Sequence, residues 1–283
     1  MKFVKMQGAG NDFVVVKPAK KDINWPKLAV AMCDRRFGVG ADGVLLVLPS
    51  KTAEFRMRMF NPDGSEAEAC GNGLRCVVKY VADRRANLAG REIAVETLAG
   101  PRKAWITAQA GIVRSVEVTM GAPRFTPNEI PVKLPGRGEL DIIQIVDYPL
   151  QVSGQKLQIT CVSMGNPHAV CFLDMPIEDF PLSEIGPQVE NHAIFPKRTN
   201  FEIVNVLSRS RVKVRVWERG AGETLACGTG ACAAAVAGQI KKLLGRKVEL
   251  ALPGGKLGVS WDGVGEVRLA GPAVEVFSGD WPE

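Results

Sequence analysis

Histidine and long apolar runs are scarce in this 283-residue sequence, and each scarcity excludes a class of protein. The only histidines are His168 and His192, and no two cysteines are spaced as Cys-X-X-Cys, so the usual zinc-site patterns are missing. No apolar run approaches the roughly 18–20 residues that a membrane span needs. The first residues have neither the apolar core of a signal peptide nor the Arg/Ser bias of a transit peptide. We therefore expect no metal, no membrane association and a cytoplasmic protein.

The cysteine count and the charge pattern exclude two further classes. Seven cysteines, an odd number with no secretory signal, argue against a disulfide framework. The net charge is +6, but the basic residues are scattered and no run is interleaved with aromatics. No RRM, KH or zinc-finger pattern is present, so we expect no nucleic-acid partner. Dispersed positive charge would instead weakly attract an acidic small molecule.

Apolar periodicity predicts short strands around a few helices, arranged twice along the chain. We expect a strand–turn–strand at residues 3–16 and again at 157–173, the second turn echoing Gly10-Asn11 with Gly165-Asn166. The predicted helices cover residues 25–37, 70–84, 185–191 and 227–244, with Gly38 capping the first. Further strands are expected at 44–48, 55–60, 93–120, 201–207, 212–217, 248–252, 257–261, 264–269 and 274–277. Residues 123–150 hold several prolines and are predicted to be the connection between two similar α+β domains.

The strongest internal repeat surrounds two cysteines. Residues 60–76 (FNPDGSEAEACGNGLRC) align without gaps on residues 217–233 (WERGAGETLACGTGACA), so that Cys70 falls on Cys227. A cysteine at a helix N-terminus meets unpaired backbone N–H groups and the positive end of the helix dipole, which favour the thiolate. Gly71 and Gly228 let a ligand approach these amides closely, as a carboxylate would require. Two buried packing cysteines or a redox-active dithiol remain the alternatives.

Matched thiols in two similar domains suit one reaction in particular. Inverting a tetrahedral carbon that carries a proton requires a base on one face and an acid on the other. A thiolate and a thiol in a cleft between the domains would provide this pair and would exchange roles in the reverse reaction. The sequence therefore predicts an epimerase or racemase that acts beside a carboxylate and stabilises the developing carbanion with amide dipoles.

Six motifs are similar to those of the diaminopimelate epimerase family. They are MQGAGNDFVVV (6–16), GVGADG (38–43), FNPDGSEAEACGNGLRC (60–76), SMGNPHAV (163–170), RTNF (198–201) and WERGAGETLACGTGACA (217–233). The resemblance implies interconversion of LL- and meso-2,6-diaminopimelate without a cofactor, in lysine and peptidoglycan precursor synthesis. It implies two pseudosymmetric domains, residues 1–120 with 271–283 and residues 121–270, each a mostly antiparallel barrel-like sheet around a central helix. It also implies a small diamino-dicarboxylate as substrate and a homodimer.

The same resemblance assigns roles to individual residues. Cys70 and Cys227 become the acid/base pair, with His168 tuning Cys70 and Glu218 tuning Cys227. The turns that grip the carboxylate at the reacting carbon are Gly71–Asn72 and Gly228–Thr229. The polar set that reads the distal end of the substrate is Asn11, Asn61, Asn166, Asn200, Glu218 and Arg219. One position departs from the pattern, since many members have Gln where this chain has Gly43.

Several alternatives stay open at this point. The asparagines stand in Gly/Pro turns, where an Asn side chain often bonds only its own backbone, and His168 could be a core histidine. A proline or hydroxyproline racemase uses the same two-thiol logic, but a substrate with one charged end has no need of Arg219, whose guanidinium suits a second carboxylate. A binding protein for a diamino acid would keep its affinity after replacement of either cysteine by alanine.

Overall fold

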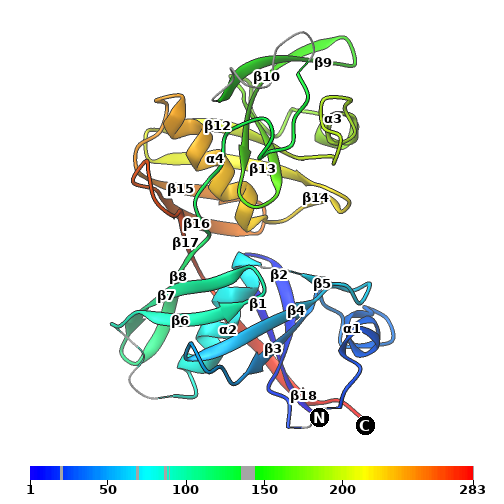
Figure 1. Cartoon of the computed structure of the whole chain (residues 1–283), viewed down its shortest axis with the longest axis vertical. Coiled ribbons are helices and arrows are strands. Elements are labelled where there is room, and N and C mark those ends of the chain that lie inside the picture. The colour runs from blue at the N-terminus through cyan, green and yellow to red at the C-terminus, as the bar shows by residue number, and fades with distance from the viewer. Residues whose placement is uncertain (20–21, 68–69, 86–87, 89, 135–143, 283) are drawn as a thin grey trace. The chain divides into compact units, whose positions relative to one another are not determined.

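The computed structural model describes residues 1–19, 22–67, 70–85, 88, 90–134 and 144–282. These residues form two compact units, Met1–Thr119 with Ala270–Glu283, and Met120–Leu269. Figure 1 shows the helices and strands of both units, most of them labelled. Each unit combines a mostly antiparallel sheet with helices, and the predicted α+β class is confirmed.

The first unit is a sheet that surrounds helix α2. Its elements are β1 (Lys2–Gly8), β2 (Asn11–Val16), α1 (Trp25–Cys33), β3 (Val44–Leu48), β4 (Phe55–Phe60), β5 (Glu66–Ala67), α2 (Gly71–Ala82), β6 (Ile93–Thr97), β7 (Gly100–Gln109), β8 (Ile112–Thr119) and β18 (Val274–Asp280). The strands pair in the order β18-β1-β2-β3-β4-β6-β7-β8; β2–β3 and β4–β6 are parallel and the other pairs are antiparallel. Helix α2 contacts β1, β2, β3, β4, β7, β8 and β18, so its side chains complete the core.

The second unit has the same design around helix α4. Its elements are β9 (Ile145–Val152), β10 (Gln155–Ser163), β11 (Pro167–Phe172), α3 (Leu182–Glu190), β12 (Asn200–Ser208), β13 (Arg211–Glu218), β14 (Gly222–Thr224), α4 (Gly228–Ile240), β15 (Lys247–Leu252) and β16 (Gly255–Ser260), followed by β17 (Arg268–Gly271) at its boundary with the first unit. The strands pair in the order β9-β10-β11-β12-β13-β15-β16, with β11–β12 and β13–β15 parallel. Helix α4 contacts β10, β11, β12, β13 and β16.

Sequence repeat and strand pairing agree between the two units. In each unit a hairpin is followed by a parallel pair, β2–β3 or β11–β12, and the second strand continues into a hairpin partner, β4 or β13. A short strand, β5 or β14, then leads to the cysteine helix. The repeat in the sequence is thus a repeat of local structure. Along the described residues no helix is long and apolar enough to cross a membrane.

Helices α1, α2 and α4 are shorter than their apolar periodicity predicts, whereas α3 begins three residues before its predicted range of 185–191. Helix α1 ends at Cys33, because the carboxylate of Asp34 accepts hydrogen bonds from the backbone N–H groups of Arg36 and Phe37 and folds the chain into a turn. Gly38 is therefore not its C-cap, and this prediction was wrong. Helix α4 ends at Ile240, because Lys242 adopts a left-handed conformation with φ of 61°.

Two other predicted boundaries are corrected. The connection predicted over residues 123–150 includes the start of β9, and residues 135–143 of it lie outside the described residues. Strand β9 pairs only with β10 among the described strands, and such an edge position is where a strand tolerates a proline such as Pro149. The strand predicted from residue 264 begins at Arg268, because Asp262 accepts backbone hydrogen bonds from Val264 and Gly265 and makes a turn there.

Candidate active site

A cysteine begins each of the two repeated helices, as the sequence predicts. Cys70 is the N-cap of α2 with φ −143° and ψ 116°, and Cys227 is the N-cap of α4 with φ −118° and ψ 118°. Each sulfur accepts a hydrogen bond from the backbone N–H three residues on, 3.4 Å from Gly73 N and 3.4 Å from Gly230 N. The sulfur takes the place that a Ser or Thr oxygen usually occupies in a helix N-cap. Both thiols therefore lie where backbone donors and the helix dipole stabilise negative charge.

The side chain of Asn11 connects Cys70 to the start of α2. Asn11 Oδ1 lies 3.8 Å from Cys70 Sγ and accepts a hydrogen bond of 3.3 Å from the Nδ2 of Asn72. Asn72 is buried, with 2% of its surface exposed, so this amide pair lies beneath the surface. The family resemblance assigns Asn11 to the distal end of the substrate, which stays a prediction; in the structure its amide oxygen lies beside the thiol of Cys70.

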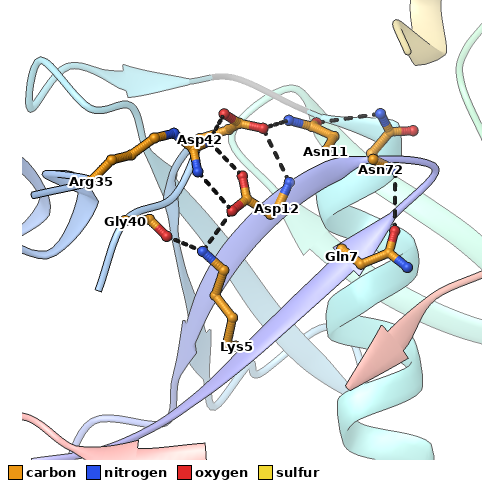
Figure 2. A network of polar contacts seen from close by, with 9 residues as sticks. Lys5, Gln7, Asn11, Asp12, Arg35, Gly40, Asp42 and Asn72 are labelled. Atoms are coloured by element: carbon orange, nitrogen blue, oxygen red, sulfur yellow. Dashed lines mark hydrogen bonds and ion pairs between the residues drawn. The ribbon is translucent and has the colours of Figure 1, made fainter. Parts of the chain in front are cut away.

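A chain of charged side chains holds Asn11 from the other side (Figure 2). Asn11 Nδ2 donates to Asp42 Oδ2 over 2.5 Å, and Asp42 pairs with Arg35 over 2.7 Å. Arg35 also pairs with Asp12 over 2.8 Å, and Asp12 pairs over 2.6 Å with Lys5, whose ammonium group donates to the carbonyl of Gly40. Because Asp42 accepts only, the Nδ2 of Asn11 must face it and Oδ1 must face Cys70.

This network also sets the charge of Asp12. Burial by itself would raise the pKa of Asp12, but hydrogen bonds from Arg35 and Lys5 outweigh it and lower the pKa to about 2. The carboxylates of Asp12 and Asp42 raise the pKa of the Arg35 guanidinium. The Asp12 carboxyl is therefore ionised at neutral pH, and the Lys5 side chain that pairs with it is only 9% exposed.

The thiol of Cys227 has a different environment. Its sulfur lies 3.4 Å from the hydroxyl of Thr229, and this hydroxyl lies 3.3 Å from Asn166 Nδ2. Burial, and then the charge of Glu218, raise the pKa of Cys227 well above the ordinary value, although the hydrogen bond from Thr229 acts against the increase. The expectation that both helix-terminal thiols have a lowered pKa is therefore wrong for Cys227. The helix N-terminus does not offset full burial near two carboxyl groups.

Behind Asn166 lies a buried histidine–glutamate pair that the sequence analysis missed in part. His168 Nδ1 is 2.7 Å from Glu202 Oε1, and His168 Nε2 is 2.9 Å from Asn166 Oδ1. Both side chains of the pair are fully buried, and burial raises the pKa of the Glu202 carboxyl. Glu202 was not among the predicted residues. Its signal was an acidic residue between the apolar residues Phe201 and Ile203 of a predicted strand.

Asn200, Glu218 and Arg219 lie together at one corner of the second unit. Asn200 is buried, donating to the carbonyl of Pro167 over 2.7 Å and accepting from the backbone N–H of Arg219 over 2.9 Å. It therefore joins the Asn166 turn to the Glu218–Arg219 corner. Glu218 accepts a hydrogen bond of 2.5 Å from Thr224, and the exposed Arg219 donates to the carbonyl of Lys197 over 3.1 Å.

Among the described residues, Asn61 makes hydrogen bonds only within its own turn. Its Nδ2 donates to Ser65 Oγ over 3.0 Å, and its backbone closes the turn with Ser65 and Gly64. Gly43, the position noted above as a departure from the resembled pattern, lies in a narrow space. A Cβ there would be 3.0 Å from the Phe60 carbonyl oxygen and 3.1 Å from Met59 Cε. Among the residues that the structure describes, no group of three or more His, Cys, Asp or Glu side chains could hold a metal ion.

Comparison with known proteins identifies a matching family. Residues 3–126 and 160–276 match the family described as diaminopimelate epimerase. The chain belongs to the diaminopimelate epimerase family. Among its relatives, the diaminopimelate epimerase of Moorella thermoacetica is 50% identical over 286 residues, covering 100% of this chain and 99% of the relative. The diaminopimelate epimerase of Methanococcus maripaludis is 45% identical over 285 residues, covering 99% of both.

Solved structures show the same fold at low sequence identity to this diaminopimelate epimerase family member. A hydroxyproline epimerase from Agrobacterium vitis superposes with a TM-score of 0.71 at 15% identity, covering 99% of this chain and 91% of the other. A phenazine biosynthesis protein from Bacillus anthracis superposes with a TM-score of 0.66 at 17% identity, covering 99% and 98%. At these identities the likeness concerns the fold alone.

Proposed function

We propose that this protein interconverts LL- and meso-2,6-diaminopimelate, with Cys70 and Cys227 as the two acid/base groups. The observation that carries the proposal is the pair of cysteine N-caps in two repeated units, each sulfur 3.4 Å from a backbone N–H. Membership of the diaminopimelate epimerase family supplies the substrate.

In this proposal one thiolate removes the α-proton while the opposite thiol delivers a proton to the other face of the same carbon. Because burial raises the pKa of Cys227, Cys227 carries its proton in the resting protein and acts first as the acid. Cys70 is then the base in this direction. In the reverse reaction Cys227 is the base and Cys70 is the acid. The α-proton of an amino acid is far less acidic than a thiol, so the developing negative charge needs donors placed in advance.

The first turns of α2 and α4 can supply those donors. The first N–H groups of a helix have no partner within the helix, and the helix dipole favours an anion there. We assign Gly71–Asn72 and Gly228–Thr229 to the carboxylate at the reacting carbon. At the distal end, Arg219 is the cation for the second carboxylate, and Glu218 contributes an acceptor for the ammonium group.

The same proposal assigns Asn11, Asn61, Asn166 and Asn200 to substrate binding, as the family resemblance implies. Asn11 and Asn166 are assigned to both substrate binding and thiol positioning, because each amide is within reach of one cysteine turn. We also assign His168 to tuning the thiol of Cys70. These two residues belong to different units, and this role stays a prediction. Glu218 is assigned to Cys227, whose pKa its charge raises. A homodimer and a cytoplasmic location are further parts of the proposal.

The activity test uses purified protein with LL-diaminopimelate and, separately, L-proline. We expect meso-diaminopimelate to form and L-proline to be unchanged. Cys70→Ala and Cys227→Ala should each lose inversion activity while keeping the melting temperature within a few degrees. Racemisation of L-proline would favour the proline racemase alternative, and full activity of either alanine variant would exclude the two-thiol scheme.

A further inference from the structure

The two units differ in one buried pair beneath the cysteine helix. In the first unit the parallel strands pair Val14 with Val44, and in the second they pair Ala169 with Phe201. Phe13 precedes Val14 as His168 precedes Ala169, and Leu45 follows Val44 as Glu202 follows Phe201. The pair Phe13–Leu45 of the first unit therefore corresponds to His168–Glu202 of the second, and all four side chains are fully buried.

Contacts with the helices confirm this correspondence. A Cβ added at Gly73 in α2 would lie 3.0 Å from Leu45 Cδ2, and a Cβ added at Gly230 in α4 would lie 2.7 Å from Glu202 Oε1. Gly73 and Gly230 occupy the same position after Cys70 and Cys227. Leu45 and Glu202 thus lie beneath the first turn of equivalent helices, one as an apolar side chain and one as a carboxyl group.

A polar pair is not the only way to fill this place in the fold. An apolar pair fills the equivalent position under α2, and replacing a buried ionic pair by apolar side chains of similar volume is often neutral or stabilising. Glu202 Oε2 is moreover buried without a hydrogen-bond partner among the described residues, which costs free energy. The pair therefore calls for a reason specific to the second unit.

Hydrogen bonds lead from this pair to the sulfur of Cys227. Glu202 Oε1 lies 2.7 Å from His168 Nδ1, and His168 Nε2 lies 2.9 Å from Asn166 Oδ1. Asn166 Nδ2 lies 3.3 Å from Thr229 Oγ1, which lies 3.4 Å from Cys227 Sγ. The corresponding hydrogen bond in the first unit joins Asn72 to Asn11 directly, with no ionisable group behind it at the position of His168.

The donor and acceptor atoms fix the direction of each hydrogen bond between Glu202 and Cys227. Asn166 Oδ1 can only accept, so His168 Nε2 must carry a hydrogen. His168 Nδ1 then shares one more proton with Glu202, and burial, which raises the pKa of that carboxyl, favours the proton on Glu202. Asn166 Nδ2 donates to Thr229 Oγ1, so the hydrogen of that hydroxyl is left to donate to Cys227 Sγ.

We propose that Glu202 is a positioning residue for Cys227, which fixes His168 and, through Asn166 and Thr229, directs a hydroxyl hydrogen onto the sulfur. The inference rests on the proposed function for its kinetic consequence, but its effect on the thiol belongs to the ligand-free protein. The chain gives Cys227 a donor that stabilises its thiolate when the proton leaves, and this donor offsets part of the cost of burial. The apolar pair beneath α2 gives Cys70 no such chain.

The test compares two substitutions of Glu202. Glu202→Leu copies the first unit and breaks the chain, whereas Glu202→Gln keeps an N–H that can donate to His168 Nδ1. We expect the Leu variant to lose about 10- to 100-fold in kcat, a typical effect of removing a residue that holds a catalytic group. The Gln variant should recover part of this loss. In the ligand-free protein, the thiolate absorbance assigned to Cys227 by difference from Cys227→Ser should shift to higher pH in the Leu variant.

Controls separate this role from folding. The double variant His168→Phe/Glu202→Leu copies the pair beneath α2 and should keep or raise the melting temperature while losing kcat. Glu178→Gln removes an exposed carboxylate that pairs with Lys213 in the same unit and should change neither quantity. If the Leu variant does not fold, the Gln and double variants are measured in the same way.

Two results would overturn the inference. One is unchanged thiol titration and kcat in the Leu variant, or in the double variant if the Leu variant does not fold. The other is equal loss in the Leu and Gln variants that follows their melting temperatures. Absence of epimerase activity in the unsubstituted protein would instead contradict the proposed function, and the thiol titration would still test the chain.

Discussion

At the scale of single residues, the two thiols have the same backbone setting and different surroundings. Each sulfur accepts a backbone N–H at 3.4 Å, so the helix start cannot distinguish them. Asn11 lies beside Cys70 and donates a hydrogen bond to the charged network through Asp42. Thr229 lies beside Cys227 and is linked through Asn166 to the buried His168–Glu202 pair. The two proposed acid/base groups therefore differ in the side chains around the repeat and not in the backbone of their helix starts.

The raised pKa of Cys227 leads to a direct prediction. Its causes are burial and then Glu218, so the thiol should remain protonated at neutral pH in the ligand-free protein. The difference in thiolate absorbance between the unsubstituted protein and Cys227→Ser should develop only above about pH 9, the ordinary value for a thiol. A titration with its midpoint near neutrality would contradict this prediction.

Asp12 provides a prediction about stability. Its carboxyl has a pKa lowered from 3.8 to about 2 by folding, so its stabilising contribution is complete above pH 3.8 and is lost as the pH falls toward 2. The contribution is on the order of 1–2 kcal/mol after allowance for partial exposure. Asp12→Asn should be less stable at neutral pH and should lose less stability between about pH 4 and about pH 2.

Thermal melts at several pH values measure both effects. Glu92→Gln removes an exposed ion pair with Lys103 in the same unit and should behave as the unsubstituted protein does. An Asp12→Asn protein that loses as much stability on acidification as the unsubstituted protein would show that Asp12 does not carry this pH dependence.

At the scale of elements, apolar alternation predicted most strands, and residues 44–48 and 55–60 match β3 and β4 to the residue. The ends of helices were predicted less well, because they depend on side-chain hydrogen bonds such as those of Asp34. Glu202 was missed for another reason. Its partner His168 is far away in the sequence, and only the parallel pairing of β11 with β12 brings them together.

The first turns of α2 and α4 offer a matched pair of substitutions. In Gly73→Ala the new methyl group meets a Leu45 methyl that can rotate away, so we expect a loss of less than about 1 kcal/mol. In Gly230→Ala it meets the Glu202 carboxyl at 2.7 Å, which is held by His168, so we expect a loss of about 1–3 kcal/mol. Chemical denaturation measures both free energies of unfolding, and a larger loss in Gly73→Ala would contradict the rigid placement of Glu202.

At the scale of the whole molecule, duplication of one α+β unit was recognisable in the sequence because the cysteine turns align without gaps. The second-unit elements follow the first in the same order of pairing, down to the short strands β5 and β14. The reading of His168 as a partner of Cys70 depends on how the units face one another, and it stays a prediction for that reason.

Oxidation tests the expectation that the two cysteines approach the same carbon. Thiols that face one ligand from opposite sides can be joined by an oxidant, so we predict a Cys70–Cys227 disulfide that inactivates the protein and is reversed by a dithiol reductant. Peptide mapping identifies the bond, and the Cys76→Ala variant serves as control because this buried helix cysteine should not take part. Inactivation without this cross-link would contradict the prediction.

The two-thiol scheme is tested most directly by the fate of the α-proton in deuterated water. At low conversion of LL-diaminopimelate, each meso molecule should carry one deuterium at the inverted carbon, and the recovered LL substrate should carry none. This follows because one thiol removes the proton and the other delivers a solvent-derived one to the opposite face. Meso product that retains the original proton, or LL substrate that gains deuterium as fast as product forms, would show that a single base serves both faces.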